Sequence, residues 1–250
     1  MKKTNLYFAS DFHLGVPNYQ ASREREAKVV AWLDAIKENA TEVFLVGDIF
    51  DFWFEYAAVI PKGFIRLQGK LAELSDAGIK LYFFKGNHDM WVFDYFKKEF
   101  NLQVISDELI IEREGKRFFI HHGDGLGDGD KSYKLLKNFF RSPFCQWLFA
   151  RIHPNLGIGI ANYWSGKSRL AGNKNLWKPD VEFEKNWAEK TYLDIEKQFG
   201  SFDYLVFGHR HNPFIISLND KTTYVNLGEW VNDSYYAQFD GEKIELKKWL

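Results

Sequence analysis

The chain has little cysteine, no long apolar run and almost no net charge. Its 250 residues include one cysteine, Cys145, which excludes an internal disulfide and favours a reducing compartment. Because aromatic residues surround it in sequence, we expect Cys145 to be a packed structural thiol. No run approaches the ~18 apolar residues that a membrane-spanning helix needs, and the first residues lack the apolar core of a signal peptide. A net charge of −1 argues against general coating of nucleic acid. We therefore expect a soluble, cytoplasmic protein.

Short apolar runs alternate with helical patterns along most of the chain. This rhythm predicts a parallel sheet with crossover helices, an α/β arrangement in one large domain spanning residues 1–250. Ser22 is a plausible N-cap of the first helix. The later segments, which alternate with turn residues, favour antiparallel strands that complete a second sheet. The expected strands are 6–10, 43–46, 79–84, 108–112, 117–121, 203–207, 214–217, 222–227, 235–239 and 243–248, and the expected helices are 22–37, 64–74 and 182–199.

Five of the predicted strands end in residues that can bind a metal. The carboxyl ends of parallel strands meet at one edge of a sheet, where ligands gather in open α/β folds. One such residue is usually a loop cap or a hydrogen-bonded histidine, but five strand ends of this kind are hard to attribute to chance. Mixed nitrogen and oxygen donors without thiolate favour Mn²⁺, Fe²⁺ or Zn²⁺ over Ca²⁺. The residues are Asp11 and His13, Asp48, Asn87 and His88, His121 and His122, and His209 and His211.

Residues 131–179 differ in character from the rest of the chain. They contain nine Lys or Arg, no Asp or Glu, and nine aromatic residues. The spacing of Leu135, Leu136, Phe139 and Phe140 indicates a helix. One interpretation is a pair of helices that pack on the sheet with solvated lysines. The other is an amphiphilic lid that meets anionic lipid or a lipid-bearing substrate, because cationic and aromatic groups occur together at such surfaces.

The strand ends also form an ordered set of motifs that resembles the calcineurin-like metallophosphoesterase superfamily. Within it the chain is most similar to the UDP-2,3-diacylglucosamine diphosphatases of the lipid A pathway. This similarity is indicated by residues 47–53, by residues 122–126 and by the basic, aromatic segment 131–179. That subfamily has Arg where this chain has His88. The resemblance implies a two-sheet β-sandwich flanked by helices. The five blocks are Asp11-Phe12-His13, Gly47-Asp48 with Asp51, Gly86-Asn87-His88-Asp89, His122-Gly123-Asp124 and Gly208-His209-Arg210-His211.

The resemblance implies two divalent metal ions, of which we expect Mn²⁺, with Asp48 as the bridging ligand. A shared carboxylate offsets the repulsion between two close cations. His122 is chosen over His121 because the family's histidine directly precedes Gly-Asp. His88 is expected to stabilise charge on the phosphoryl group, with the alternative that it only orients Asp48 or Asp11, whereas Asp51, Asp89 and Asp124 would orient ligands. One metal would be held by Asp11, His13, Asp48 and His211, and the other by Asp48, Asn87, His122 and His209.

The implied reaction is attack of a metal-bridging hydroxide on the α-phosphorus of UDP-2,3-diacylglucosamine. It would release UMP and 2,3-diacylglucosamine 1-phosphate. The expected partners are this UDP-linked lipid and an anionic membrane surface, with peripheral association at the inner face of the cell inner membrane and no nucleic acid. The native metal and the oligomeric state stay open. The substrate contacts that the resemblance suggests are Asn87, His88, Asp130, Tyr133, Ser168, Asn173 and Lys174.

Two other functions compete with this one. A phosphodiesterase with the same metals could act on nucleotides or nucleic acid, using the basic aromatic insertion to stack single strands. A scaffold that has lost catalysis would keep the fold, but it should lack some ligands, and every block here is complete.

Overall fold

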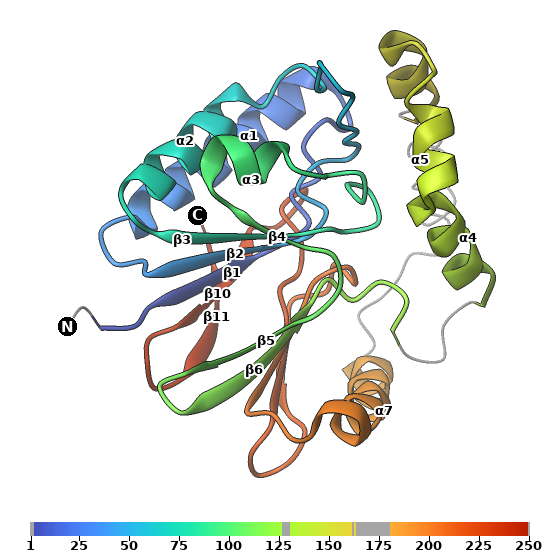
Figure 1. Cartoon of the computed structure of the whole chain (residues 1–250). Helices are drawn as coiled ribbons and strands as arrows, with labels where there is room; N and C mark the ends of the chain where they lie inside the picture. Colours follow the sequence, from blue (N-terminus) through green and yellow to red (C-terminus); the bar gives the residue numbers. More distant parts are fainter. Residues whose placement is uncertain (1–2, 127–130, 162, 164–180, 250) are drawn as a thin grey trace.

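Two β-sheets packed face to face form the body of the protein, with helices on both outer faces (Figure 1). The computed structural model describes residues 3–126, 131–161, 163 and 181–249. Helices α1 (Tyr19–Ile36), α2 (Ile65–Asp76) and α3 (Tyr95–Phe100) cover the first sheet, and α7 (Val181–Phe199) covers the second. The two-sheet sandwich flanked by helices is therefore confirmed.

The first sheet has six strands in the order β11-β10-β1-β2-β3-β4. Four of its strands, β1 to β4, run parallel, each joined to the next by a helix, as the sequence rhythm predicts. Helix α3 and strand β4 were not expected from the sequence, because both are short. The strands are β1 (Leu6–Ala9), β2 (Glu42–Val46), β3 (Lys80–Phe84), β4 (Gln103–Ile105), β10 (Tyr235–Phe239) and β11 (Ile244–Lys248).

The second sheet has five strands in the order β5-β6-β7-β9-β8. One expectation about the C-terminal strands was wrong, since β10 and β11 do not join this sheet. Instead β10 pairs antiparallel with β1, with Phe8 opposite Ala237, and β11 follows as the outer strand. In addition, β9 lies parallel to β7. Alternation of side chains shows that a segment is a strand but not which edge it pairs with. The strands are β5 (Leu109–Arg113), β6 (Lys116–His121), β7 (Tyr204–Phe207), β8 (Phe214–Ser217) and β9 (Thr223–Asn226).

Alternate residues of each central strand enter different cores. In β2, Val43 and Leu45 face the helices, whereas Phe44 and Val46 face the second sheet. The layer between the sheets is largely aromatic, and the ring of Phe44 stacks on Tyr82 with centroids 4.4 Å apart. The 18% aromatic content is thus used in part to fill a sandwich whose central strands are buried on both faces.

Helix α1 begins earlier than the sequence suggests. Asn18 is its N-cap, and the Asn18 side chain accepts a hydrogen bond from the backbone N–H of Ala21. Ser22, the predicted cap, lies inside the helix, and its hydroxyl accepts a hydrogen bond from the N–H of Gly15. This bond fixes the loop that follows β1, so Ser22 supports the strand end that carries His13.

The segment between β6 and α7 contains α4 (Lys131–Arg141), α5 (Pro143–Phe149) and a further helical stretch at 154–161. These helices stand beside the two sheets (Figure 1). The helix predicted from Leu135, Leu136, Phe139 and Phe140 is confirmed. Cys145 is buried in α5 against Phe54 and Trp91, as expected of a structural thiol. Among the described helices, none combines the length and the apolar character needed to cross a membrane.

Candidate metal centre

The predicted ligands meet where the strands of both sheets end, and most of them have an unusual backbone. Five of the seven predicted metal ligands adopt a positive φ, a conformation that non-glycine residues rarely take. Such strain persists only where the surrounding structure enforces it, and it concentrates at functional sites. The five residues and their φ angles are Asp11 (55°), His13 (43°), Asp48 (53°), His209 (67°) and His211 (53°).

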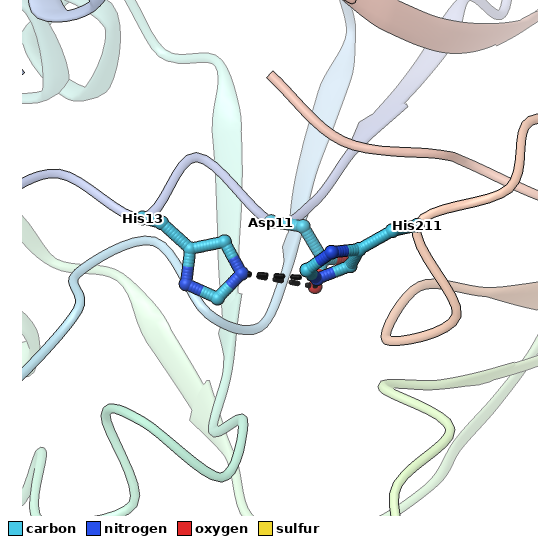
Figure 2. A group of neighbouring side chains, drawn as sticks. All are labelled: Asp11, His13 and His211. Atoms are coloured by element: carbon cyan, nitrogen blue, oxygen red, sulfur yellow. Dashed lines mark hydrogen bonds and ion pairs between the residues drawn. The ribbon is translucent and has the colours of Figure 1, made fainter. Parts of the chain in front are cut away.

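Asp11, His13 and His211 form one cluster, although the first and last are 200 positions apart in sequence. The Nε2 atoms of His13 and His211 are 3.1 Å apart, and Asp11 Oδ1 lies 3.1 Å from His211 Nε2. Figure 2 shows the three side chains pointing at one another. The ligand atoms of the three residues all lie within 4.8 Å of one another, as ligands of one ion do.

Asp48, His122 and His209 form a second cluster beside the first. His122 Nε2 lies 3.3 Å from Asp48 Oδ2 and 3.4 Å from Asn87 Oδ1. The same Asp48 Oδ2 is 4.0 Å from His13 Nε2, which belongs to the first cluster. Asp48 therefore stands between the two groups, in the position that a bridging carboxylate requires.

Two glycines allow this close approach. A Cβ atom on Gly47, which has a φ of +83°, would lie 2.4 Å from His122 Nδ1. A Cβ atom on Gly86 would lie 2.1 Å from Asp48 Oδ1. Because real Cβ atoms do not come so close, any other residue at either position would displace the ligand beside it.

The two adjacent histidines of the fourth block have different surroundings. His122 Nδ1 lies 2.8 Å from the carbonyl oxygen of Val46, which leaves its Nε2 directed at Asp48. A backbone carbonyl on one ring nitrogen orients a histidine in this way when the other nitrogen is to bind a metal. His121 Nδ1 instead accepts a hydrogen bond from the N–H of Gly123. The cluster thus contains His122 and not His121.

Burial and charge set the protonation of the centre. Burial would raise the pKa of the Asp48 carboxyl, but His122, His88 and His13 together hold that pKa well below its ordinary value. Burial lowers the pKa of His13 to about 3 and that of His209 to about 4, so both rings are neutral at pH 7. Burial would also lower the pKa of His122, but Asp48 raises it to about 10. Divalent ions bind carboxylates and neutral imidazoles, so Asp48, His13 and His209 already have the required forms, whereas His122 would lose its proton when an ion binds.

Asp89 fastens the loops after β2 and β3 to each other. Its carboxylate accepts hydrogen bonds from the N–H groups of Gly86 at 2.7 Å, Ile49 at 2.8 Å, and Asp48 and Phe50 at 3.3 Å. Burial, with a smaller contribution from Asp48, raises the pKa of Asp89 to about 7. The side chain thus orients the backbone that carries Asp48 and Asn87.

Asp51 lies beside two histidines of the site. Its Oδ1 atom is 3.6 Å from His13 Nδ1 and 3.4 Å from His88 Nδ1. The His88 ring also meets the carbonyl oxygen of Asp51 at 3.0 Å, whereas the backbone N–H of His88 donates to Asp48 Oδ1 at 2.9 Å. Replacing the His88 ring would therefore leave its hydrogen bond to Asp48 in place.

Two further ion pairs support the centre, and the sequence did not indicate either of them. Lys137 Nζ in α4 lies 2.7 Å from the buried Asp124 carboxylate, which joins the insertion to the block that carries His122. Arg210 donates through Nε to Glu184 of α7 at 2.7 Å, and this fixes the loop between His209 and His211. Lys137 is one of nine cations in its segment, so no spacing could have singled it out.

The predicted substrate contacts divide into two groups. Asn87 and His88 lie at the centre, as described above. Asp130, Ser168, Asn173 and Lys174 lie outside the described residues. Tyr133 is in helix α4, but its side chain is also outside the described part of the structure.

Comparison with known proteins agrees with this geometry. A sequence profile of the calcineurin-like phosphoesterase family matches residues 4–213, a span that includes all seven predicted metal ligands. The chain is 34% identical over 255 aligned residues to a UDP-2,3-diacylglucosamine hydrolase of Porphyromonas gingivalis, with 98% of this chain and 97% of the relative covered. It is 27% identical to the enzyme of that name in Proteus mirabilis, with 96% of each covered. Among solved structures it resembles Yfce, a phosphoesterase from E. coli, at 16% identity and a TM-score of 0.46, over 96% of this chain and 91% of that one. The chain belongs to the calcineurin-like phosphoesterase family.

Proposed function

We propose that this protein hydrolyses the pyrophosphate bond of UDP-2,3-diacylglucosamine and releases UMP and 2,3-diacylglucosamine 1-phosphate. The observation that carries the proposal is the 34% identity to a UDP-2,3-diacylglucosamine hydrolase along 98% of the chain. The two clusters of converging ligand atoms support it, because a phosphoric anhydride is hydrolysed readily by a dinuclear centre.

The donor set fits two divalent ions. It offers carboxylate, carboxamide and imidazole atoms, and no cysteine lies among them, a chemistry that suits Mn²⁺ and also Fe²⁺ or Zn²⁺. We propose Mn²⁺ as the native ion. Bound ions would supply Lewis-acid stabilisation of the phosphoryl oxygens and activation of water. In the proposed assignment one ion is held by Asp11, His13, Asp48 and His211, and the other by Asp48, Asn87, His122 and His209.

We propose that His88 contacts the phosphoryl oxygens of the substrate. It follows Asn87 directly, and its side chain is 19% exposed beside the buried ligands. The Asp51 carbonyl and carboxylate orient its ring. In this role His88 would contribute a positive or hydrogen-bonding contact as charge grows on those oxygens.

Within residues 131–179, the described helices α4 and α5 have a surface that suits a lipid substrate. Leu135, Phe139, Phe144 and Trp147 each expose half or more of their area, and Leu136 and Leu148 do so as well. Cations lie among them, with the Arg151 guanidinium 4.6 Å above the Trp147 ring. Cations beside exposed aromatic and aliphatic groups favour the interface of an anionic membrane. We propose that the protein binds peripherally to the cytoplasmic face of the inner membrane, where it meets its substrate.

Hydrolysis assays with purified protein test the proposal. The protein is supplied with Mn²⁺ and offered UDP-2,3-diacylglucosamine in mixed micelles, bis-p-nitrophenyl phosphate, or an oligonucleotide. We expect release of UMP from the first substrate at a kcat/KM at least about a hundredfold above that for the other two. Activity on the last two alone would contradict the lipid assignment and establish the competing phosphodiesterase.

Liposome flotation tests the membrane surface separately. We expect binding to vesicles with anionic lipid, weakened when Phe139 and Trp147 are both replaced by Ser. Replacement of Tyr235, which is half-buried in β10, by Ser is the matched control and should leave binding unchanged. Equal flotation of wild type and the double variant would show that this surface does not bind the membrane.

A further inference from the structure

A cavity of about 600 Å³ opens beside the metal centre, on the side of helices α1 and α2. Leu14 and Gly15, which follow His13 directly, line it together with Asp51. Because Asp51 Oδ1 lies 3.6 Å from His13 Nδ1, the cavity begins one side chain away from a predicted metal ligand. Ile158 and Gly159 of the helical stretch at 154–161 also line it. A substrate phosphate at the centre would thus have room for one of its substituents here.

The walls of the cavity combine aromatic rings with cations. Tyr19, the first residue of α1, lines it with a side chain that is 79% exposed, and Phe64 contributes a second ring. Lys62 and Arg66 stand on the same wall, are exposed, and form no ion pair with any described residue. Arg23, the third cation, is 3.2 Å from the Glu26 carboxylate. The cavity therefore has two cations available to an anionic ligand.

These features distinguish between the two halves of a UDP-linked lipid. A pyrimidine base binds well to the face of an exposed aromatic ring, and a phosphate binds to Lys and Arg. The volume lies within the ~300–1,000 Å³ of small-molecule sites. Acyl chains would have to cover Lys62 and Arg66, at a cost in desolvation. They have an alternative in the apolar surface of α4 and α5, which contains no acidic residue.

We propose that this cavity binds the nucleoside monophosphate half of the substrate. The base would stack on the ring of Tyr19, and the phosphate of the nucleotide would lie between Arg66, Lys62 and the metal centre. The assignment rests on the proposed function and adds the direction in which the substrate lies. The nucleotide extends toward α1 and α2, and the acylated sugar extends toward α4 and α5. UMP would then be the product that leaves from the α1 side.

Binding of UMP to the purified, metal-supplied protein tests the cavity directly. Equilibrium dialysis with labelled UMP gives Kd for wild type and for Arg66→Ala, Tyr19→Ala and Tyr19→Phe. We expect the two Ala variants to weaken UMP about tenfold each and Tyr19→Phe to stay within about twofold, since it keeps the ring. Lys28→Ala is the matched control, because Lys28 is an exposed cation of helix α1, the helix that contains Tyr19, and does not line the cavity. Thermal melting checks that all variants fold.

The same variants are measured with 2,3-diacylglucosamine 1-phosphate, with uridine and with inorganic phosphate. We expect the lipid product to bind all of them equally, and Arg66→Ala to affect UMP but not uridine. Unchanged Kd for UMP in both Ala variants, absence of UMP binding to wild type, or weakened binding of the lipid product instead would each overturn the assignment.

Parallel hydrolysis assays separate this outcome from failure of the proposed function. If wild type hydrolyses UDP-2,3-diacylglucosamine while the variants keep the affinity for UMP, only the cavity assignment fails. If wild type does not hydrolyse that lipid but UMP binding depends on Arg66 and Tyr19, the proposed function fails and the nucleotide site stands.

Discussion

The two ends of strand β2 contain the same kind of side chain in opposite situations. At its start, the buried Glu42 carboxylate accepts hydrogen bonds from Arg113 Nε at 2.6 Å, from Arg113 Nη2 at 2.9 Å and from the Tyr82 hydroxyl at 2.9 Å. Just beyond its end, Asp48 has a strained backbone and stands among histidines whose nitrogens point at one another. One carboxylate is fully satisfied by protein groups, whereas the other belongs to a group of ligands that converge on common points.

One end of the sandwich therefore stabilises the fold, whereas the other end carries the candidate metal site. Arg113 lies in β5, so the pair with Glu42 links the second sheet to the first at the end away from the centre. Strain and close like-charged groups at the other end cost stability, and the rest of the fold must offset them. We therefore expect variants at the Asp48 end to remove activity and variants at the Glu42 end to remove stability.

The largest effect is expected for Asp48→Ala. Because Asp48 stands between both clusters, its loss should lower bound metal from about two ions per chain and reduce kcat by about a thousandfold or more. Metal content by elemental analysis and hydrolysis of UDP-2,3-diacylglucosamine measure the two results. Glu42→Gln is the control in which both should be retained. Two bound ions in Asp48→Ala would contradict the bridging role.

His88→Ala should reduce kcat by about a hundredfold while metal content and KM change little. The backbone N–H of His88, which donates to Asp48, is unaffected by the substitution. His88→Arg, which introduces the residue of the similar subfamily, should retain more activity than His88→Ala. The idea is wrong if His88→Ala hydrolyses the substrate within about threefold of wild type at full metal content.

Glu42→Gln should destabilise the protein by about 2 kcal/mol without a change in kcat, because the Arg113 guanidinium then lacks the carboxylate with which it pairs. We place the value below that of a fully buried pair because the Arg113 side chain is 27% exposed and water screens it. Urea unfolding of the metal-free protein gives the free energy, and an unchanged midpoint would show that the pair does not hold the sheets together.

The smallest effect concerns pH. Burial would raise the pKa of Glu42, but hydrogen bonds from Arg113 and Tyr82 lower it below its ordinary value. A lowered pKa in the folded state means that the stabilisation is complete above the unfolded pKa of about 4.5 and is lost as pH falls further. The difference in unfolding free energy between wild type and Glu42→Gln should thus shrink below about pH 4.5. A difference that stays constant down to pH 3 would rule out this ionic contribution.

Part of the site could be predicted because its residues are local to their strands. Asp11 and His13, Asp48, Asn87, and His209 and His211 each follow an apolar run that is readable as a strand, and parallel strands bring their ends to one edge. Spacing does not separate His121 from His122, and the choice of His122 rested on the resemblance, in which the histidine directly precedes Gly-Asp. The physical reason for that choice lies in the carbonyl of Val46, which orients the ring of His122 from another strand.

Ion pairs and strand pairings between separate segments could not be predicted either, because local sequence does not show them. Nothing near Lys137 shows that it pairs with Asp124, or near Arg210 that it pairs with Glu184. The sheet that β10 joins could not be predicted either, because the alternation of side chains in β10 suits both sheets. Each of these depends on which surfaces meet after the sheets have packed.

The sequence by itself determined most of the strands, the longer helices and the chemical type of the site, because hydrophobic periodicity and ligand-bearing strand ends are local properties of the chain. Only the tertiary structure decided that β10 joins β1, that Asp48 stands between two clusters, and that a cavity with Tyr19, Lys62 and Arg66 opens beside them. Those facts arise from contacts between segments up to 233 residues apart, which burial of the sheets and of their aromatic core brings together.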